Sequence, residues 1–257
     1  MQEKNNIGTL FDRIAGRYDL LNHLLSLNID KRWRRKAVRM LAETETKAEG
    51  KTEATTKAKA TTNAKENAKA EQLRVLDVAI GTGDLAIEIT RQLPQAQVQG
   101  VDLSEEMMLI GKQKVRKAGL QERIGFMQAS ALELPFADGS FDIVTCAYGV
   151  RNFSDLDRGL QEMQRVLREG GRMMILEFSY PSNKFIARVY DLYFSHVLPW
   201  VGRMLSKDKT AYSYLNKSVK GFVWGEKMCE RLRQAGLRQV EHKPLTFGIT
   251  TIYTATK

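Results

Sequence analysis

The fold of this chain is decided by residues 75–84, which read VLDVAIGTGD. A short apolar run leads into a glycine turn and then a helical pattern, so the stretch predicts a strand, a tight turn and a helix. Glycine has no Cβ, so Gly81 and Gly83 let the backbone turn sharply and let a ligand approach it closely. About twenty residues later a second predicted strand ends in Asp102, whose carboxylate can accept hydrogen bonds from both hydroxyls of a ribose. Together the two elements predict a site for a cofactor that contains adenosine.

Length and charge bound the class of protein. The chain has 257 residues, and 40 Lys and Arg against 30 Asp and Glu give it a net charge of +10. The length suits one α/β domain. The charge favours an anionic partner, either nucleic acid or an acidic membrane surface, although a merely basic surface explains it equally well. No apolar run has the length of a membrane span, and no signal-peptide-like segment follows Met1, so we expect a cytoplasmic protein.

Neither a disulfide framework nor a metal site is indicated. Cys146 and Cys229 form no CxxC pair, and His23, His196 and His242 are scattered along the chain. We therefore expect no bound metal.

Strands and helices alternate through the middle of the chain, which is typical of a mostly parallel sheet with helices on both faces. The predicted strands are 73–79, 97–102, 123–129, 141–147, 172–178, 237–243 and 249–256. The predicted helices between them are 83–93, one that begins after an N-cap at Ser104, and 155–168.

We expect a single domain over residues 1–257, with 73–178 as its cofactor-binding core, 1–42 as an N-terminal helical cap and 237–257 as the last strands. Residues 43–72 contain no Leu, Ile, Val or aromatic residue, so they cannot join a core. We interpret them as a low-complexity insertion, either disordered or a fraying helix, with an interaction arm as the alternative. Residues 179–236 are rich in aromatic residues and are expected to form a helical lid over the substrate, with ordinary helix packing as the alternative.

The sequence of the glycine turn is compatible with two classes of cofactor. The turn and the residues after it fit the dinucleotide pattern G-x-G-x-x-A, so a dehydrogenase is formally allowed. However, Asp84 stands at the N-terminus of the following helix, where it would repel a diphosphate. S-adenosylmethionine carries a sulfonium and an amino group and no phosphate, so the electrostatics favour the methyl donor. Ser130 and Ala131, after the third strand, can read the edge of an adenine.

This series of motifs resembles the class I S-adenosylmethionine-dependent methyltransferases. The resemblance implies a Rossmann-like α/β fold with a mostly parallel seven-stranded sheet. It also implies that the cofactor is held by Gly81, Thr82, Gly83, Asp84, Asp102, Leu103, Ser130, Ala131 and Ala147.

A closer resemblance covers nearly the whole chain outside residues 43–72. Residues 11–22 (FDRIAGRYDLLN) and 148–152 (YGVRN) are similar to signatures of the ubiquinone/menaquinone biosynthesis C-methyltransferases, as are 176–179, 212–215 and 245–249. Residues 222–224 (FVW) depart from the usual Phe-Pro without touching the cofactor motifs.

The closer resemblance implies methylation of a ring carbon of a polyprenylated quinol. We prefer the menaquinone branch, in which demethylmenaquinol becomes menaquinol. A methoxy-benzoquinol of the ubiquinone branch is the alternative. An RNA methyltransferase is less expected, because the sequence has no appended RNA-binding module and no base-methylation motif, so no nucleic-acid partner is predicted.

The reaction needs a phenolate whose charge reaches the attacking ring carbon. Arg151 is the first catalytic candidate, because its guanidinium could hold the quinol oxygen. The alternative is that it pairs with a local acid such as Asp155. Asn152 is expected to orient the same oxygen, and Tyr148 to contact the substrate. Tyr18 and Asp19 are expected to close the site from the N-terminal side.

The prenyl tail of such a substrate resides in the bilayer. A basic helix with Trp33 and the aromatic region 185–205 could dock on anionic lipid, although a solvated charged face explains the helix equally well. We therefore expect a cytoplasmic enzyme with peripheral contact at the inner face of the cytoplasmic membrane. The oligomeric state is left open, with a homodimer as one alternative.

Overall fold

The computed structural model describes residues 8–9, 11–12, 15–16, 26, 28–56, 72–193, 218–219 and 221–257, with side chains of the helix that begins at Ile29 described as far as Ala42. The strands are β1 (Leu73–Val78), β2 (Ala96–Asp102), β3 (Ile124–Gln128), β4 (Phe141–Ala147), β5 (Leu167–Phe178), β6 (Arg238–Leu245) and β7 (Thr250–Thr256). The helices are α2 (Ile29–Thr56), α3 (Asp84–Gln92), α4 (Glu105–Lys117), η1 (Val150–Asn152), α5 (Leu156–Val166), α6 (Lys184–Leu192), α9 (Glu226–Gln234) and η3 (Thr246–Gly248).

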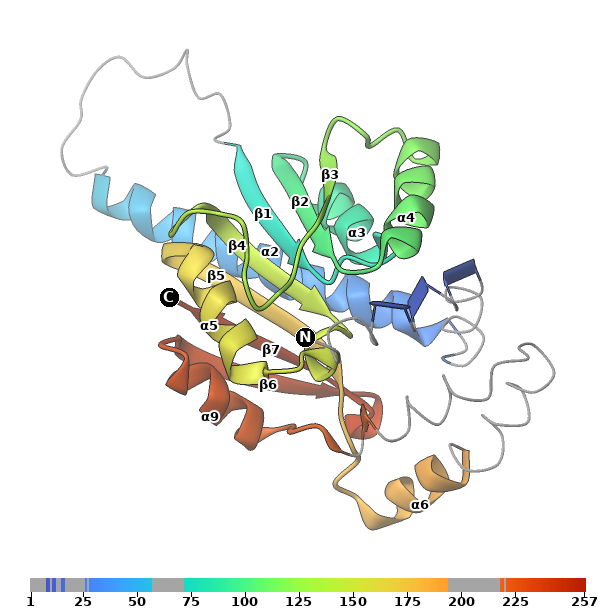
Figure 1. The fold of residues 1–257 in the computed structure, drawn as a ribbon. Coiled ribbons are helices and arrows are strands. Elements are labelled where there is room, and N and C mark those ends of the chain that lie inside the picture. Colours follow the sequence, from blue (N-terminus) through green and yellow to red (C-terminus); the bar gives the residue numbers. More distant parts are fainter. Residues whose placement is uncertain are drawn as a thin grey trace.

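The described strands form one seven-stranded sheet in the order β3-β2-β1-β4-β5-β7-β6 (Figure 1). Neighbouring strands are parallel except for β7, which is antiparallel to both β5 and β6. This confirms the predicted fold class. The direction in which the chain winds reverses between β1 and β4, and sheets of this kind bind their ligands at the carboxyl ends of the strands beside such a reversal.

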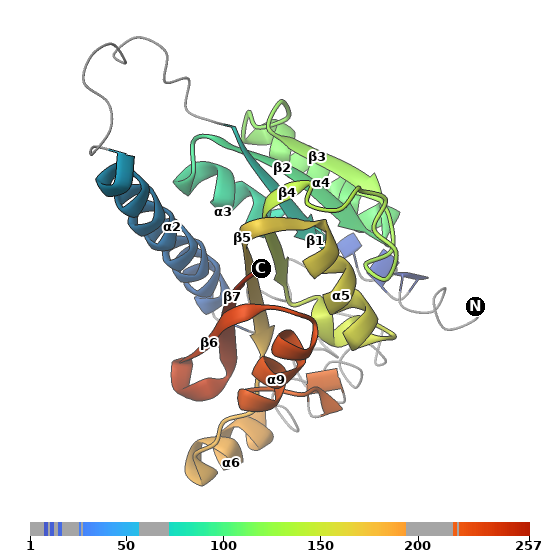
Figure 2. The same ribbon diagram turned by 90° about the vertical axis from the view of Figure 1, so that its left-hand side faces the viewer.

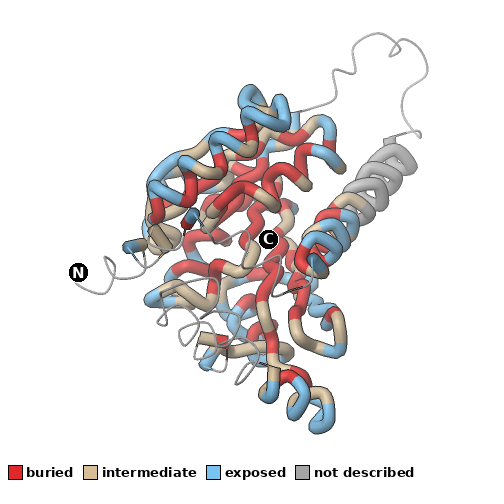
Figure 3. The backbone as a smooth tube through the Cα atoms, turned by 90° about the vertical axis from the view of Figure 1, so that its right-hand side faces the viewer, coloured by how far each residue is buried: buried red, intermediate tan, exposed pale blue. Residues whose placement is uncertain are grey.

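The two faces of the sheet have separate hydrophobic cores. The core on one face joins the sheet to α2, α3 and α4, and the core on the other joins it to α5 and α9. Figure 2 shows α2 and α5 on opposite sides of the sheet, and in the tube of Figure 3 the buried residues are concentrated between these layers. Within β5, Met173 and Ile175 pack on one side and Met174 and Leu176 on the other. An unbroken apolar run is therefore the expected sequence for a strand buried on both faces.

Helix α2 extends into the insertion and buries its aromatic residue. It runs from Ile29 to Thr56, so the first residues of the range 43–72 are helical, which was one of the two expected alternatives; their Ala, Lys and Glu favour helix more than their threonines oppose it. Trp33 is only 6% exposed, and its Nε1 donates a hydrogen bond to Thr246 Oγ1 at 2.8 Å. The prediction that Trp33 docks on lipid is therefore wrong, because this side chain belongs to the core.

The range predicted to form a lid contains two different kinds of helix. Helix α9 packs on the sheet through Met228, Cys229 and Leu232, so it is a layer of the fold and the lid prediction does not hold for it. Helix α6 follows β5 and lies apart from the sheet (Figure 1). None of the described helices is long and apolar enough to cross a membrane.

Candidate functional site

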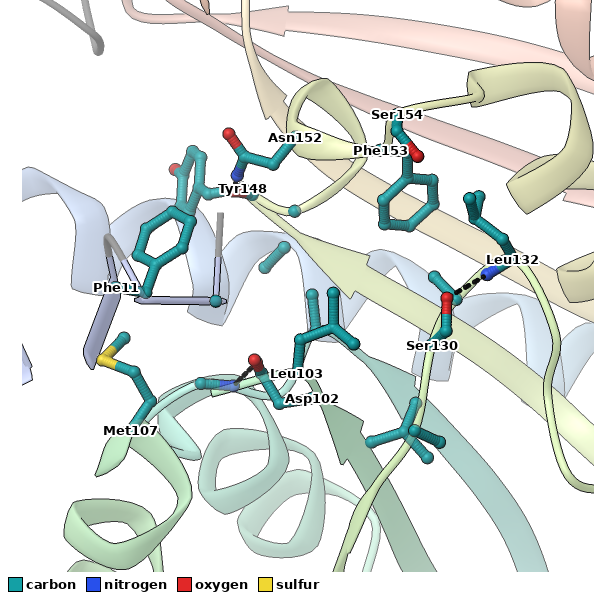
Figure 4. Close-up of a pocket in the computed structure, with 18 residues that line it drawn as sticks. Phe11, Asp102, Leu103, Met107, Ser130, Leu132, Tyr148, Asn152, Phe153 and Ser154 are labelled. Atoms are coloured by element: carbon teal, nitrogen blue, oxygen red, sulfur yellow. Dashed lines mark hydrogen bonds between the residues drawn. The ribbon is translucent and has the colours of Figure 1, made fainter. Parts of the chain in front are cut away.

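A pocket lies where the carboxyl ends of β1, β2, β3 and β4 meet, at the winding reversal of the sheet (Figure 4). The space between its walls, including the open mouth, is about 860 Å3. It is lined by Gly8, Phe11, Ala79, Gly81, Val101, Asp102, Leu103, Met107, Ala129, Ser130, Ala131, Leu132, Ala147, Tyr148, Gly149, Asn152, Phe153 and Ser154.

Asp102, at the end of β2, is the acid that the pocket presents. Its Oδ2 accepts a hydrogen bond from the Gly81 backbone N–H at 2.8 Å, and its Oδ1 accepts one from Ser104 N–H at 2.9 Å. Burial raises the pKa of Asp102, and these backbone donors oppose that rise. The carboxylate is therefore fixed in orientation while remaining at the pocket wall, as a receptor for a diol requires.

The glycine turn has the backbone conformation that the sequence predicts. Gly81 and Gly83 have φ angles of +54° and +77°, in the left-handed region that glycine adopts without strain. Ala79, two residues before Gly81, also has a positive φ, of +57°, which costs a residue with a Cβ about 1–2 kcal/mol. Gly149 faces this turn so closely that a Cβ added to it would lie 2.6 Å from the Ala79 Cβ and 2.7 Å from Cys146 Sγ. The winding reversal is therefore tightly packed beneath the pocket.

The residues after β3 form the far wall of the pocket. Ser130, Ala131 and Leu132 line it, and Ser130 Oγ accepts a hydrogen bond from the Leu132 backbone N–H at 3.2 Å. Figure 4 shows Phe153 on the same side of the pocket as Ser130 and Leu132. The wall thus offers flat apolar surface together with backbone polar groups, which suits a heteroaromatic base.

Three residues of the predicted cofactor set do not line the pocket: Thr82, Gly83 and Asp84. Asp84 instead forms ion pairs with Lys114 and with Arg34, the latter at 3.1 Å. Asp84 therefore does not repel a diphosphate from the pocket as the sequence predicted, because two cations from α2 and α4 neutralise it outside the pocket. The sequence could not reveal these partners, which come from helices on either side of α3 along the chain.

A buried acid lies in the strand beneath the glycine turn. Asp77 is 1% exposed, and its Oδ1 accepts a hydrogen bond from Thr145 Oγ1 at 2.8 Å. Its Oδ2 has no hydrogen-bond partner among the described residues. Burial raises the pKa of Asp77 to about 7, and the charge of Asp102 adds to this rise.

The turn after β4 is strained and held by hydrogen bonds. Tyr148 has a φ of +57°, which is a genuine outlier for a bulky side chain. Its N–H donates to the Leu176 carbonyl at 2.7 Å, and its carbonyl accepts from Arg151 Nη1 at 2.6 Å and from Asn152 Nδ2 at 3.3 Å. Such strain persists only where the surroundings determine it fully, and it concentrates at functional sites.

Arg151 does not line the pocket. Its Nη1 forms an ion pair with Glu177 Oε1 at 2.6 Å, its backbone N–H donates to Glu177 Oε2 at 3.3 Å, and its guanidinium lies 5.2 Å from the centre of the Phe178 ring. The structure therefore does not place it on a substrate oxygen. The alternative interpretation, pairing with an acid, is correct in kind but not in the partner, because Asp155 instead caps α5 by accepting from Arg158 N–H.

The remaining predicted residues divide in two. Asn152 and Tyr148 line the pocket with the predicted cofactor residues Gly81, Asp102, Leu103, Ser130, Ala131 and Ala147. Tyr18 and Asp19 lie outside the described residues, as does His196. Sequence reasoning missed the roles of Phe11 and Met107, which form the wall beside Asp102 (Figure 4). In the sequence, Phe11 is only an apolar residue of the motif at 11–22, and Met107 is only a residue of the helix predicted after Ser104.

Comparison with known proteins places the chain among methyltransferases. The chain matches the model of the ubiE/COQ5 methyltransferase family over residues 1–257. It is 41% identical to a demethylmenaquinone methyltransferase of Bacteroides fragilis over 256 residues, which cover 100% of this chain and 94% of that one. It is also 41% identical to the ubiquinone/menaquinone biosynthesis C-methyltransferase UbiE of Geobacter sulfurreducens, over 100% of this chain and 90% of that one.

A solved structure supports the fold. An S-adenosylmethionine-dependent methyltransferase from Thermotoga maritima, described as a possible histamine N-methyltransferase, superposes with a TM-score of 0.60 and 18% sequence identity. The match covers 97% of this chain and 99% of that chain.

Proposed function

Because the chain belongs to the ubiE/COQ5 methyltransferase family, we propose that it transfers a methyl group from S-adenosylmethionine to a ring carbon of demethylmenaquinol, forming menaquinol. The observation that carries this function is the full-length similarity to relatives that bear that name. A methoxy-benzoquinol acceptor is the second candidate, because the Geobacter sulfurreducens relative is named for both quinone branches.

The pocket residues fit the cofactor. Asp102 supplies two fixed carboxylate oxygens for the ribose hydroxyls, and Ser130, Ala131 and Leu132 supply the wall for the adenine. Gly81 lets the backbone approach the amino-acid part closely. When bound, S-adenosylmethionine supplies an electrophilic methyl group on a sulfonium.

The substrate ring is proposed to lie against the turn after β4. Asn152 lies at this wall and is proposed to hydrogen-bond a quinol oxygen, which favours the phenolate that carries charge to the ring carbon. Burial raises the pKa of Tyr148, so this residue stays protonated and is suited to donate a hydrogen bond. Arg151 is proposed as a positioning residue, because it holds the Tyr148 carbonyl and is itself held by Glu177.

The function is tested with purified protein, labelled S-adenosylmethionine and a short-chain demethylmenaquinol under reducing conditions. Transfer of label to the ring carbon is the expected result. A short-chain methoxy-benzoquinol is assayed in parallel, and transfer to this acceptor alone would replace the menaquinone branch by the ubiquinone branch. If neither quinol is methylated while calorimetry shows cofactor binding, the proposed substrate class is wrong.

Helix α6 is proposed to hold the enzyme at the membrane surface in which such a substrate resides. Its Phe185, Val189 and Leu192 are exposed, and their spacing places them on one face of the helix. Lys184 and Arg188 are exposed beside this stripe, so they can meet anionic headgroups. The opposite side of α6 buries Tyr190. Burial raises the pKa of this phenol, and the positive charge of Arg151 opposes that rise.

Flotation with vesicles of phosphatidylglycerol and phosphatidylcholine tests this docking. An apolar side chain contributes about 1.5–3 kcal/mol when it leaves water, so replacing Phe185, Val189 and Leu192 by serine is expected to weaken binding by roughly a hundredfold or more. The control, Leu109→Ser with Met127→Ser, removes exposed apolar residues elsewhere and is expected to leave binding unchanged. Equal flotation of both variants would refute docking through α6. The soluble short-chain assay tests the reaction separately.

A further inference from the structure

Three side chains with metal-binding atoms meet on the face of the molecule opposite α2, where α9 packs beside β6. Glu226 and Cys229 lie one helical turn apart on α9, and His242 projects from β6. Their carboxylate, thiol and imidazole atoms all lie within 4.8 Å of one another. None of the three lines the pocket described above.

Two of the separations between these atoms are close to those of tetrahedral coordination, and all of them are within 4.8 Å. Zinc binds sulfur at about 2.3 Å and nitrogen or oxygen at about 2.0–2.2 Å, so neighbouring ligand atoms of a tetrahedral site lie about 3.3–3.6 Å apart. Cys229 Sγ lies 3.4 Å from His242 Nδ1, and that nitrogen lies 3.8 Å from Glu226 Oε2. The imidazole nitrogen thus sits between the two other ligands at nearly the required separations.

The surroundings orient the ligands and leave one side open. Glu226 uses its other oxygen, Oε1, to accept a hydrogen bond from Arg233 Nη1 at 2.7 Å, so Oε2 is directed towards His242. Cys229 is buried, whereas Glu226 and His242 have side chains that are 60% and 31% exposed. Water can therefore reach the cluster from the side of the glutamate and supply a fourth ligand.

A nucleophilic thiol explains the cluster less well. Cys229 is buried, and the acidic Glu226 lies one helical turn before it with its carboxylate near the thiol. Reactive cysteines have the opposite environment, electropositive and with a lowered pKa. A metal ion reverses this balance, because it displaces the thiol proton to solvent and pairs with the thiolate and the carboxylate.

We propose that Glu226, Cys229 and His242 bind one divalent transition-metal ion of the zinc class, with water as the fourth ligand. The ion would join α9 to β6 and so fasten the helical layer to the edge strand of the sheet. Its role would be structural, and the methyl-transfer pocket does not depend on it. The chemistry of the donors, one sulfur, one nitrogen and one oxygen, excludes calcium and magnesium as preferred occupants.

Titration of the metal-free full-length protein with Co2+ tests the proposal. Cobalt bound to a thiolate gives a charge-transfer absorption in the near ultraviolet, and we expect this band to saturate at one equivalent and to disappear when Zn2+ is added. Cys229→Ser is expected to abolish the band. His242→Ala is expected to weaken Co2+ binding roughly tenfold or more.

The matched control is Cys146→Ala, which removes the other cysteine, from β4, and is expected to keep the band. Circular dichroism establishes that each variant is folded. Thermal unfolding gives a second readout, in which Zn2+ raises the midpoint of the wild type and of Cys146→Ala but not of Cys229→Ser. Absence of the band in the wild type, or its persistence in Cys229→Ser, would overturn the proposal. Methylation of the short-chain quinol is measured independently, so failure of the metal site and failure of the proposed function are distinguishable.

Discussion

Replacement of Asp77 by asparagine is expected to stabilise the protein by an amount that grows as the pH rises. Asp77 is enclosed beneath the glycine turn, and burial raises its pKa from 3.8 to about 7. Asparagine has the same shape, keeps the Oδ1 that accepts from Thr145, and cannot ionise. The substitution therefore removes the charge of the side chain and little else.

The sign and size follow from the two pKa values. Between pH 3.8 and about 7 the folded protein keeps a proton on Asp77 that the unfolded chain has lost, so its stability falls as the pH rises through this window. The loss through this one group is about 2.5 kcal/mol between about pH 5 and about pH 8. The variant has no such group, so its advantage over the wild type should grow by about that amount.

Urea unfolding of both proteins without cofactor, at about pH 5 and about pH 8, measures the effect. All other titrating groups are common to the two proteins, so their contributions cancel in the difference. Asp142→Asn serves as a control without pH dependence: partial burial opposes the shift, but hydrogen bonds from Arg74 N–H and Arg168 lower the pKa of Asp142, so its carboxylate is ionised in both the folded and the unfolded chain above about pH 5. That control should lose stability relative to the wild type by the same amount at both pH values. An advantage of Asp77→Asn that is equal at both pH values would refute the reasoning.

Three further substitutions test the site. Arg151→Met should lower the free energy of unfolding, measured in urea, by about 3–5 kcal/mol, because it leaves the buried Glu177 carboxylate unpaired. Adding Glu177→Gln to this variant should recover much of the lost stability, and no recovery would contradict a specific ion pair. Asp102→Asn should weaken cofactor binding roughly tenfold or more by calorimetry, and unchanged affinity would remove Asp102 from the ribose site. Gly149→Ala should lower the free energy of unfolding by about 1–3 kcal/mol, because the new Cβ collides with the Ala79 methyl. Adding Ala79→Gly should restore part of this stability, and additive effects of the two substitutions would contradict the contact.

The strands and the residues that line the Asp102 side of the pocket were predictable because their signals are local. The apolar strand, the glycines with positive φ and the acid at the end of β2 are each set by a few neighbouring residues. Ser104, predicted to cap the helix after that strand, does accept from Met107 N–H at 3.2 Å. The order of the strands was not predicted, because the alternation of strands and helices fits more than one doubly wound order; the pairing in the structure gives it.

The partners of charged side chains were not predictable, because they come from distant parts of the chain. Arg151, in the turn after β4, forms an ion pair with Glu177 of the neighbouring strand β5. Asp84 forms ion pairs with cations from two other helices. Cys229 and His242 form no sequence motif, yet a helix packed on a strand brings them together. Sequence spacing indicates which residues carry chemistry, whereas the packing of layers determines whether each of them faces the ligand or a neighbour.

The connection between α2 and β1 enters the sheet at the amino end of β1, whereas the pocket opens at the carboxyl ends of the strands (Figure 1). The six residues of β1 separate the two by roughly 20 Å. A change in the length of this connection is therefore expected to leave methyl transfer unchanged. For the experimenter, the same separation makes residues 57–71 the place for an affinity tag or a fluorophore in an active enzyme.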